Sequence, residues 1–478
     1  MTVLVPTLES ELGEEKRLLR FSHLRLMSMQ EHHPSGEERS SQVIRRSVAQ
    51  ERLDFQLAPT RDTITGRAGL ALFQEAALVL GVRKSIEENL PPPGSGNGFK
   101  PQEYVLPLTL MLCGGGRTLE DIREIEMDAG LRQLCGFTRL PGADAIGQWL
   151  RKPEHLKGLK QVNQFQERQV IVRSDANDFT MDVDATMVET KKQCADMTYL
   201  GHRAFQALLS FIAELDLCVA CDYRQGSVPA GSGVKKQLLA THRLLKSCGK
   251  RLAYLRSDSA GYTADVINTC NDLDVTFTIT ADQDTAVVRI IRNLNRQGGW
   301  KRLFRPDGKA TDRWYKTATH CMEKTEKAFT LIVLRWPNPK SDLFHPQPYC
   351  YHVIATSDDQ RKPHEVIWFH NGRGDAENYN KELKNGFGMD YAPCRSLQAD
   401  AVYFEIGVLS YNLTTAVKRL LLGDDWVRRT IASLRWQLIQ IAGKVVRHGR
   451  QLILRVRKSH FELFQTVRQR LALLPAPG

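Results

Sequence analysis

Hydrophobic positions change their spacing partway along the chain. Between residues 62 and 152, apolar side chains recur every three or four positions, which predicts helices at 68–80, at 104–112, after Thr118 and at 145–150. From residue 177 onward, shorter apolar runs predict strands that alternate with helices. The first of these strands are expected at 179–184, 205–217, 219–223, 251–257 and 274–281, with helices at 233–248 and 262–273.

A second group of short apolar runs follows and has mainly β character. It predicts strands at 300–304, 313–319, 328–336, 349–357 and 365–370. Helices are then expected at 375–385 and 399–422, and a strand pair around His448 and Gly449. The order of three strands, helix, strand, helix and strand is that of an RNase H-like core. We therefore predict an α/β fold whose RNase H-like core is interrupted by a β-rich insertion.

These patterns divide the chain into six expected segments. Residues 1–60 mix charged, Ser, Gln and His residues without sustained periodicity, which is typical of disorder. The predicted order is a disordered extension at 1–60, a helical DNA-binding region at 61–170, the first part of the core at 171–290, the β-rich insertion at 291–364, the second part of the core at 365–422 and a basic C-terminal region at 423–478.

Composition and charge narrow the class of protein. The 478 residues are 42% hydrophobic and 25% charged, as in ordinary soluble proteins, and no apolar run is long enough to span a bilayer. We expect a cytoplasmic protein with no membrane partner. The net charge is +12, and residues 411–478 hold 13 Lys and Arg against three acidic residues. Such a segment favours binding to phosphate backbones, although a solvated basic face is the alternative.

Two candidate carboxylates lie at the ends of predicted strands. Asp182 and Asp184 share one face of the 179–184 strand, because side chains alternate between faces. Asp258 follows the 251–257 strand and precedes small residues that allow a tight turn. Carboxylates at strand ends suit a metal site in an α/β fold. Taken alone, the first strand could simply reach solvent, and Asp258 could be a helix cap.

A third candidate carboxylate lies on the predicted 375–385 helix. Arg373, Glu377, Lys381 and Lys384 are spaced by four, four and three residues, which places them on one stripe. Surface helices often carry such charges as salt-bridge pairs. The spacing of Arg, three residues, Glu, six residues and Lys is nevertheless specific.

At this point the chain resembles a known family. Arg373, Glu377 and Lys384 match the Tyr-Arg-Glu-Lys signature of bacterial insertion-sequence DDE transposases, with His370 where the signature has Tyr. The chain is similar to the Insertion Sequence 1380 family in particular, over about residues 60–460 and in the same order. The segments that carry this similarity are Asp182-Val-Asp-Ala-Thr186, Arg256-Ser-Asp-Ser259, Gly374-Asp-Ala-Glu-Asn378 and Lys381-Glu-Leu-Lys-Asn-Gly-Phe-Gly388.

The resemblance implies a DNA transposase that cuts the inverted-repeat ends of its element and joins them to target DNA. Its catalytic and metal-binding residues would be Asp184, Asp258 and Glu377, with two Mg²⁺ ions that Mn²⁺ could replace. The expected DNA contacts are Arg373, Lys381, Lys384 and His370. The partner would be double-stranded DNA, bound by a homodimer, and the protein would be associated with the bacterial nucleoid.

Three other functions fit part of the pattern. A metal-dependent glycosyltransferase would use Asp182-x-Asp184 on a sugar nucleotide. A transposase-derived protein could bind DNA without cutting it, and an RNase H-like nuclease could cut without joining strands. The glycosyltransferase accounts for Asp182-x-Asp184 but not for the Arg-Glu-Lys helix or the basic tail, and a strand-transfer assay would separate the nuclease from the transposase.

Overall fold

The described part of the chain is helical at both ends and contains one large sheet between them. A computed structural model describes residues 53, 55–340 and 347–476. The chain divides into two units, Met1–Thr60 and Arg61–Gly478, and the second contains the elements below. The disorder predicted for residues 1–60 falls almost entirely outside the described residues. Within the described ranges, no helix is both long and apolar enough to cross a membrane.

The N-terminal part is helical, as its spacing predicts. Pro101 starts one helix, and the Glu103 carboxylate accepts a hydrogen bond from the Lys100 N–H at 2.6 Å. The 19-residue helix after Pro153 was not predicted as an element of its own. The helices are α1 (Leu70–Val79), α2 (Val82–Asn89), α3 (Pro101–Gly114), α4 (Ile122–Glu126), α5 (Ala129–Cys135), α6 (Ala143–Leu150) and α7 (Pro153–Ile171).

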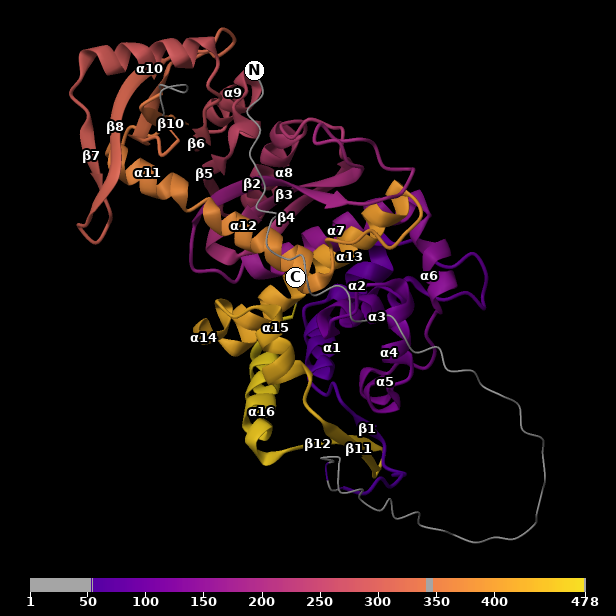
Figure 1. Cartoon of the computed structure of the whole chain (residues 1–478). Coiled ribbons are helices and arrows are strands. Elements are labelled where there is room, and N and C mark those ends of the chain that lie inside the picture. Colours follow the sequence, from indigo (N-terminus) through magenta and orange to yellow (C-terminus); the bar gives the residue numbers. More distant parts are fainter. Residues whose placement is uncertain (1–52, 54, 341–346, 477–478) are drawn as a thin grey trace, which may run out of the picture. The chain divides into compact units, whose positions relative to one another are not determined.

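Nine strands form a single mixed sheet in the order β4-β3-β2-β5-β6-β10-β9-β8-β7 (Figure 1). The pairs β2–β5 and β5–β6 are parallel, and the other neighbours are antiparallel. The strands are β2 (Asp178–Glu189), β3 (Ala204–Ile212), β4 (Leu217–Gln225), β5 (Arg251–Ser257), β6 (Thr276–Thr280), β7 (Lys301–Phe304), β8 (Ala310–His320), β9 (Phe329–Pro337) and β10 (Tyr349–Thr356). The parallel crossovers run through α8 (Val234–Ser247) and α9 (Ala264–Asp272).

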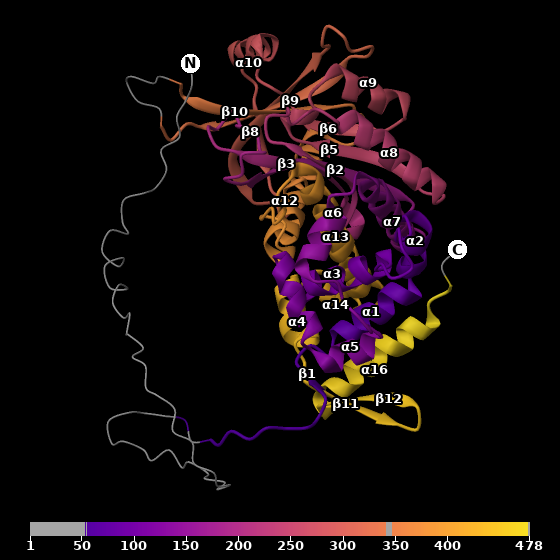
Figure 2. The same ribbon diagram turned by 90° about the vertical axis from the view of Figure 1, so that its right-hand side faces the viewer.

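Helices cover both faces of the central strands. Figure 2 shows α8 and α9 on one side of the sheet, and α12 (Gly374–Lys381) and α13 (Leu397–Ala416) on the other. Both faces of β2 are therefore buried over its first half, including Thr180 and Asp182. The alternative that this face of the strand simply reaches solvent is therefore wrong for Asp182, which is fully buried.

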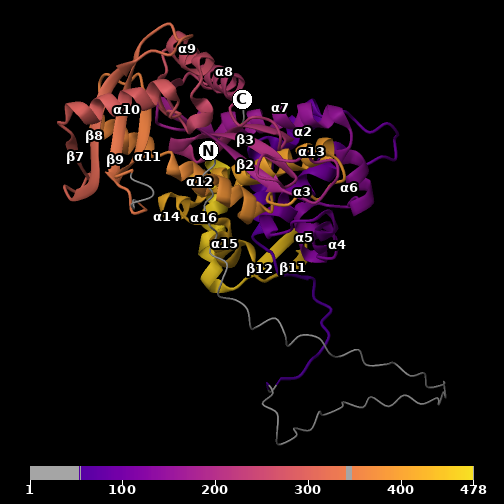
Figure 3. The ribbon, with the colours of Figure 1, turned by 45° about the horizontal axis from the view of Figure 1, so that its top comes forward.

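The strands predicted between residues 300 and 357 are confirmed, with ends within three residues, and they continue the central sheet. Two helices pack with them. Figure 3 shows α10 (Thr285–Gln297) beside β8 and β9; Asp284 caps this helix by accepting the Val287 N–H at 2.8 Å. The strand predicted at 365–370 is wrong, because α11 (Pro363–Asn371) occupies it. Pro363 begins that helix, and the Glu365 carboxylate accepts the Lys362 N–H at 2.8 Å.

The C-terminal part returns to the N-terminal helices. The buried helix α13 contacts α3, α6 and α7, and α16 contacts α1. The predicted strand pair is confirmed as a hairpin that forms a three-stranded sheet with β1. These elements are β1 (Ile64–Thr65), π-helical turns at Glu382–Gly386, Val417–Leu422 and Arg435–Ile439, α14 (Asp424–Val427), α15 (Ile431–Leu434), β11 (Gly443–His448), β12 (Gln451–Val456) and α16 (Lys458–Leu473).

Candidate active site

Asp184 and Asp258 become neighbours through the parallel pairing of β2 with β5. The register pairs Asp182 with Arg256 and Val183 with Ser257, so the next residue on each strand is a candidate carboxylate. Asp258 then leaves the sheet, and its Oδ1 accepts the Ala260 N–H at 3.0 Å as the chain turns. The turn requires Gly261, since a Cβ there would lie 2.5 Å from the Ser257 Oγ. Asp258 is thus both a turn cap and a neighbour of Asp184.

Asp184 lies in a shielded and electrostatically crowded position. Its side chain is 18% exposed, and Asn380 donates a hydrogen bond from Nδ2 to its Oδ2 at 2.5 Å. Burial, followed by the charge of Asp258, raises the pKa of Asp184 from 3.8 to about 6, and Glu377 adds to the effect. Arg373 opposes it, with Nη1 3.7 Å from Oδ1. The site therefore concentrates negative charge that a cation would offset.

Glu377 faces Asp184 across a small cavity. The helix α12 contacts β2 and β3, which brings this side of the helix to the sheet. The Glu377 side chain is 67% exposed, and its Oε1 lies 3.4 Å from Nη2 of Arg373. The cavity has a volume of about 270 Å³. It is lined by Asp184, Thr186, Glu377, Asn380, Lys381, Lys384 and Asn385.

The structure brings the three predicted carboxylates near one another without gathering them into a finished metal site. Asp184 and Glu377 share the cavity, whereas Asp258 does not line it. Within the described ranges, no group of three His, Cys, Asp or Glu residues has the geometry to hold a metal ion. Arg373 instead contacts both Asp184 and Glu377. The donors suit a hard divalent cation in chemical type, since carboxylate oxygens are what Mg²⁺ prefers.

Asp182 differs sharply from Asp184, although the two share a strand face. Asp182 is fully buried, and its two carboxylate oxygens accept bonds from Nε and Nη2 of Arg256, both at 2.6 Å. Burial raises the pKa of Asp182, and Arg256 acts against this shift. Arg256 also donates to the Phe369 carbonyl at 3.0 Å, which ties β5 to α11. This enclosed pair argues against a glycosyltransferase in which Asp182 and Asp184 bind a sugar nucleotide together.

The predicted DNA-contacting residues fall into two groups. Lys381 is exposed, and the Lys384 ammonium donates to the Met187 carbonyl at 2.8 Å beside the cavity. His370 is buried, with its ring nitrogens 3.2 Å from the Thr278 hydroxyl and 3.1 Å from the Thr280 hydroxyl.

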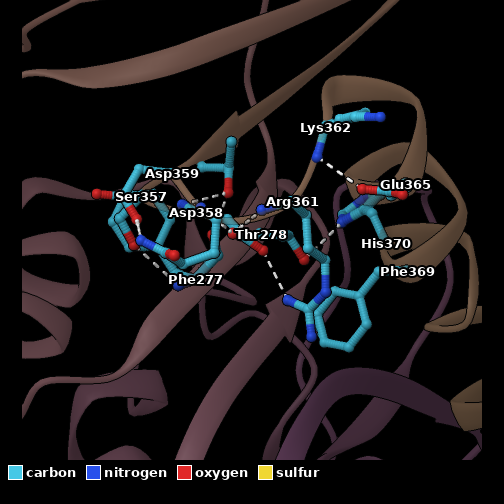
Figure 4. Close-up of polar contacts among 12 residues, drawn as sticks. Phe277, Thr278, Ser357, Asp358, Asp359, Arg361, Lys362, Glu365, Phe369 and His370 are labelled. Carbon is cyan, nitrogen blue, oxygen red and sulfur yellow. Dashed lines mark hydrogen bonds and ion pairs between the residues drawn. The ribbon is translucent and has the colours of Figure 1, made fainter.

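Figure 4 shows His370 beside Thr278, at the end of the helix that Lys362 and Glu365 begin. Burial lowers the pKa of His370 to about 3, so the ring is neutral. His370 therefore holds α11 against β6, and this enclosed position does not present its ring to a phosphate.

Asn380 is a site residue that the sequence interpretation missed. Its amide makes the shortest polar contact to Asp184, and its Oδ1 is buried without a hydrogen-bond partner among the described residues. The available signal was position alone. Asn380 is three residues beyond Glu377 and four before Lys384, which puts all three on one side of a helix.

Comparisons with known proteins can be set beside this geometry. The family model described as "Transposase DDE domain group 1" matches residues 50–476. No curated protein matches the chain. Among solved structures, the chain is similar to a cryo-EM structure of the piggyBac transposase synaptic complex with hairpin DNA, with a TM-score of 0.42 and 10% identity. That likeness covers 79% of this chain and 82% of the other.

Proposed function

The chain belongs to the DDE transposases of group 1, and we propose that it binds the inverted-repeat ends of an insertion sequence, cuts them and joins the freed 3′-OH to target DNA. The observation that carries this proposal is the arrangement of Asp184, Asp258 and Glu377. Two of these carboxylates line one cavity, and the third follows the neighbouring parallel strand. The Tyr-Arg-Glu-Lys signature with His370 in its first place, and membership of the Insertion Sequence 1380 family, are part of the same proposal.

The proposed core is RNase H-like. Its support is the order β4-β3-β2-β5-β6, in which an antiparallel meander of three strands is followed by two strands parallel to β2. The expected boundaries at residues 61, 171, 291, 365 and 423 are proposed with it. Strand ends of such a sheet concentrate functional residues, which fits Asp258 directly after β5. Asp184 lies inside β2, which runs on to Glu189 instead of ending at residue 184, and it follows the last residue of β2 that pairs with β5.

Two Mg²⁺ ions, or Mn²⁺ in their place, would be held by Asp184, Asp258 and Glu377. When bound, the ions supply activation of the attacking oxygen and relief of charge at the leaving oxygen. The protein's own residues would orient the carboxylates and hold the DNA. Asn380 holds the Asp184 carboxylate in place through its 2.5 Å bond. Arg373, Lys381 and Lys384 line or border the cavity and would hold the phosphates of the strand being cut.

The proposed partner is double-stranded DNA, bound by two copies of the chain. The basic C-terminal region supports DNA binding. Lysines and arginines that neutralise phosphates release the counterions condensed on DNA, and this release favours binding. A transposition event needs two element ends, and each end needs one set of carboxylates. The homodimer on DNA is proposed from the family resemblance, and light scattering of the DNA complex would measure its mass.

Substitution of Glu377 tests the proposal. Glu377→Gln should abolish cleavage of DNA that carries the element ends in Mg²⁺ while DNA binding persists, since the amide keeps the shape and removes the anionic ligand. Glu326→Gln is a matched control, because Glu326 is exposed, undergoes the same change of charge and does not line the cavity with Asp184. Normal cutting by Glu377→Gln would contradict the assignment. Cleavage without strand joining in the unmodified protein would favour a nuclease instead.

A further inference from the structure

A second and larger cavity lies along the other side of the helix that carries Glu377. Its volume is about 940 Å³, and we name it the α12 groove. It is bounded by α12 and its π-helical turn, by the end of α13, and by residues 427–435. Lys381 and Asn385 line both this groove and the Asp184–Glu377 cavity. The two cavities therefore adjoin along one edge of the helix.

Four acidic residues line the groove; three of them are engaged within the protein, and Asp375 is the fourth. Glu214 accepts the Thr180 N–H with both oxygens, at 3.1 and 2.9 Å. Asp216 forms an ion pair with Arg419 at 2.8 Å. Glu382 accepts the N–H of Ile431. These three carboxylates therefore have partners within the protein before any ligand enters: Asp216 has an ion pair, and Glu214 and Glu382 have backbone hydrogen bonds.

Three cations of the groove have no such partners. Within the described ranges, no hydrogen bond or ion pair is found for the side chains of Lys381, Lys418 or Arg428, and all three line the cavity. Lys418 is half-buried, and this burial lowers its pKa, although Glu382 and Asp216 act in the opposite direction. A half-buried ammonium without an ion pair is unfavourable, and an anion beside it would relieve that cost.

We propose that the α12 groove binds the phosphodiester backbone of the DNA strand that passes the candidate active site, through Lys381, Lys418 and Arg428. This inference rests on the proposed function for the identity of the polyanion. Three separate cations in a cavity of about 940 Å³ suit a chain of phosphates better than a single free anion. Continuity with the Asp184–Glu377 cavity at Lys381 and Asn385 places that chain in line with the site of cutting.

The salt dependence of DNA binding tests this groove directly. Each phosphate contact contributes about 0.9 to the slope of log affinity against log salt on duplex DNA and about 0.7 on a single strand. Lys418→Gln and Arg428→Gln should each lower the slope of the full chain by about one contact, and the double variant by about two. Lys246→Gln is the control, because Lys246 lies on α8, lines neither cavity and should leave the slope nearly unchanged.

The probes are a duplex and a single strand of the same sequence. Because one contact contributes about 0.9 on the duplex and about 0.7 on the single strand, each slope loss is first divided by that figure to give a number of lost contacts. More lost contacts on the duplex assign the groove to duplex DNA, and more on the single strand assign it to a separated strand. An unchanged slope for Arg428→Gln and for the double variant would overturn the proposal. Arg428 is exposed, so its variant keeps the test valid if Lys418→Gln fails to fold. Cleavage by Glu377→Gln, measured separately, tests the proposed function without affecting this result.

Discussion

Asp182→Asn and Asp184→Asn should damage the protein in opposite ways, although the two residues are separated by one position on β2. Asp182 and Arg256 form a buried ion pair with two contacts of 2.6 Å and side-chain exposures of 0% and 9%. Removal of one partner leaves a buried charge uncompensated, which costs about 3–5 kcal/mol. Asp182→Asn should therefore lower the free energy of unfolding by about 3 kcal/mol or more.

Asp184→Asn should keep or increase stability while cleavage is lost. A pKa raised from 3.8 to about 6 means that ionised Asp184 destabilises the metal-free fold by about 2–3 kcal/mol. The folded protein holds this proton more tightly than the unfolded chain does. The cost is thus absent below pH 3.8, grows as pH rises and is complete above about 6. The stability gained by Asp184→Asn should grow over the same interval.

Urea unfolding followed by tryptophan fluorescence, in EDTA at pH 5 and pH 8, measures both effects. Cleavage of element-end DNA in Mg²⁺ completes the comparison. The double variant Asp182→Leu with Arg256→Met should be less destabilised than Asp182→Asn, because no unpaired charge remains. A stable Asp182→Asn protein that cannot cut DNA would refute this reasoning, as would an Asp184→Asn protein that unfolds more readily than the unmodified chain at pH 8.

Three further predictions follow from local geometry. Gly69→Ala should lower the free energy of unfolding by about 1–3 kcal/mol, because the new Cβ would lie 2.0 Å from the Leu438 carbonyl oxygen. Gly66→Ala is the control, since a Cβ there would have no atom within 4 Å, and equal melting temperatures of the two variants would contradict the expectation. The free energy of unfolding of the unmodified protein should be about 2 kcal/mol lower at pH 5 than at neutral pH, because the pKa of His370 is 6.5 in the unfolded chain and about 3 in the folded protein, so only the unfolded chain binds this proton at pH 5. Urea unfolding of His370→Gln should lack this pH-dependent contribution. Arg435 donates to three carbonyls at the ends of α3 and of the π-helical turn after α12. Arg435→Met should therefore lower the free energy of unfolding by at least about 2 kcal/mol, and with it the melting temperature and the rate of DNA cleavage.

Most central strands could be predicted from their apolar runs, but the strand predicted at 205–217 is too long, because β3 ends at Ile212 and a 3-10 turn at Ala213–Leu215 leads into β4. The strand at 365–370 could not be distinguished from a helix by its short apolar run alone. The local signals at its start, Pro363 and Glu365, favour a helix and decide the outcome. The helix α10 has equally readable signals, with Asp284 as its cap and Val287, Ile291 and Leu294 at helical spacing.

The site was predictable in outline and not in detail. Strand alternation puts Asp182 and Asp184 on one face, so only the tertiary contact of Arg256 with Asp182 separates their roles. The stripe from Arg373 to Lys384 assumed a regular helix. A π-helical turn at Glu382–Gly386 changes the register after Lys381, and the Lys384 ammonium reaches the Met187 carbonyl instead of Glu377.

The position of β10 between β6 and β9 has a consequence for any attempt to shorten this protein. Deletion of residues 285–356 would remove the partner of β6 and leave a row of unpaired backbone N–H and C=O groups at a new sheet edge. Such an edge recruits strands from other chains, so the trimmed protein should aggregate. A chain nicked in the turn between β7 and β8 should instead stay in one piece, because the strands on both sides of the break keep their ladders.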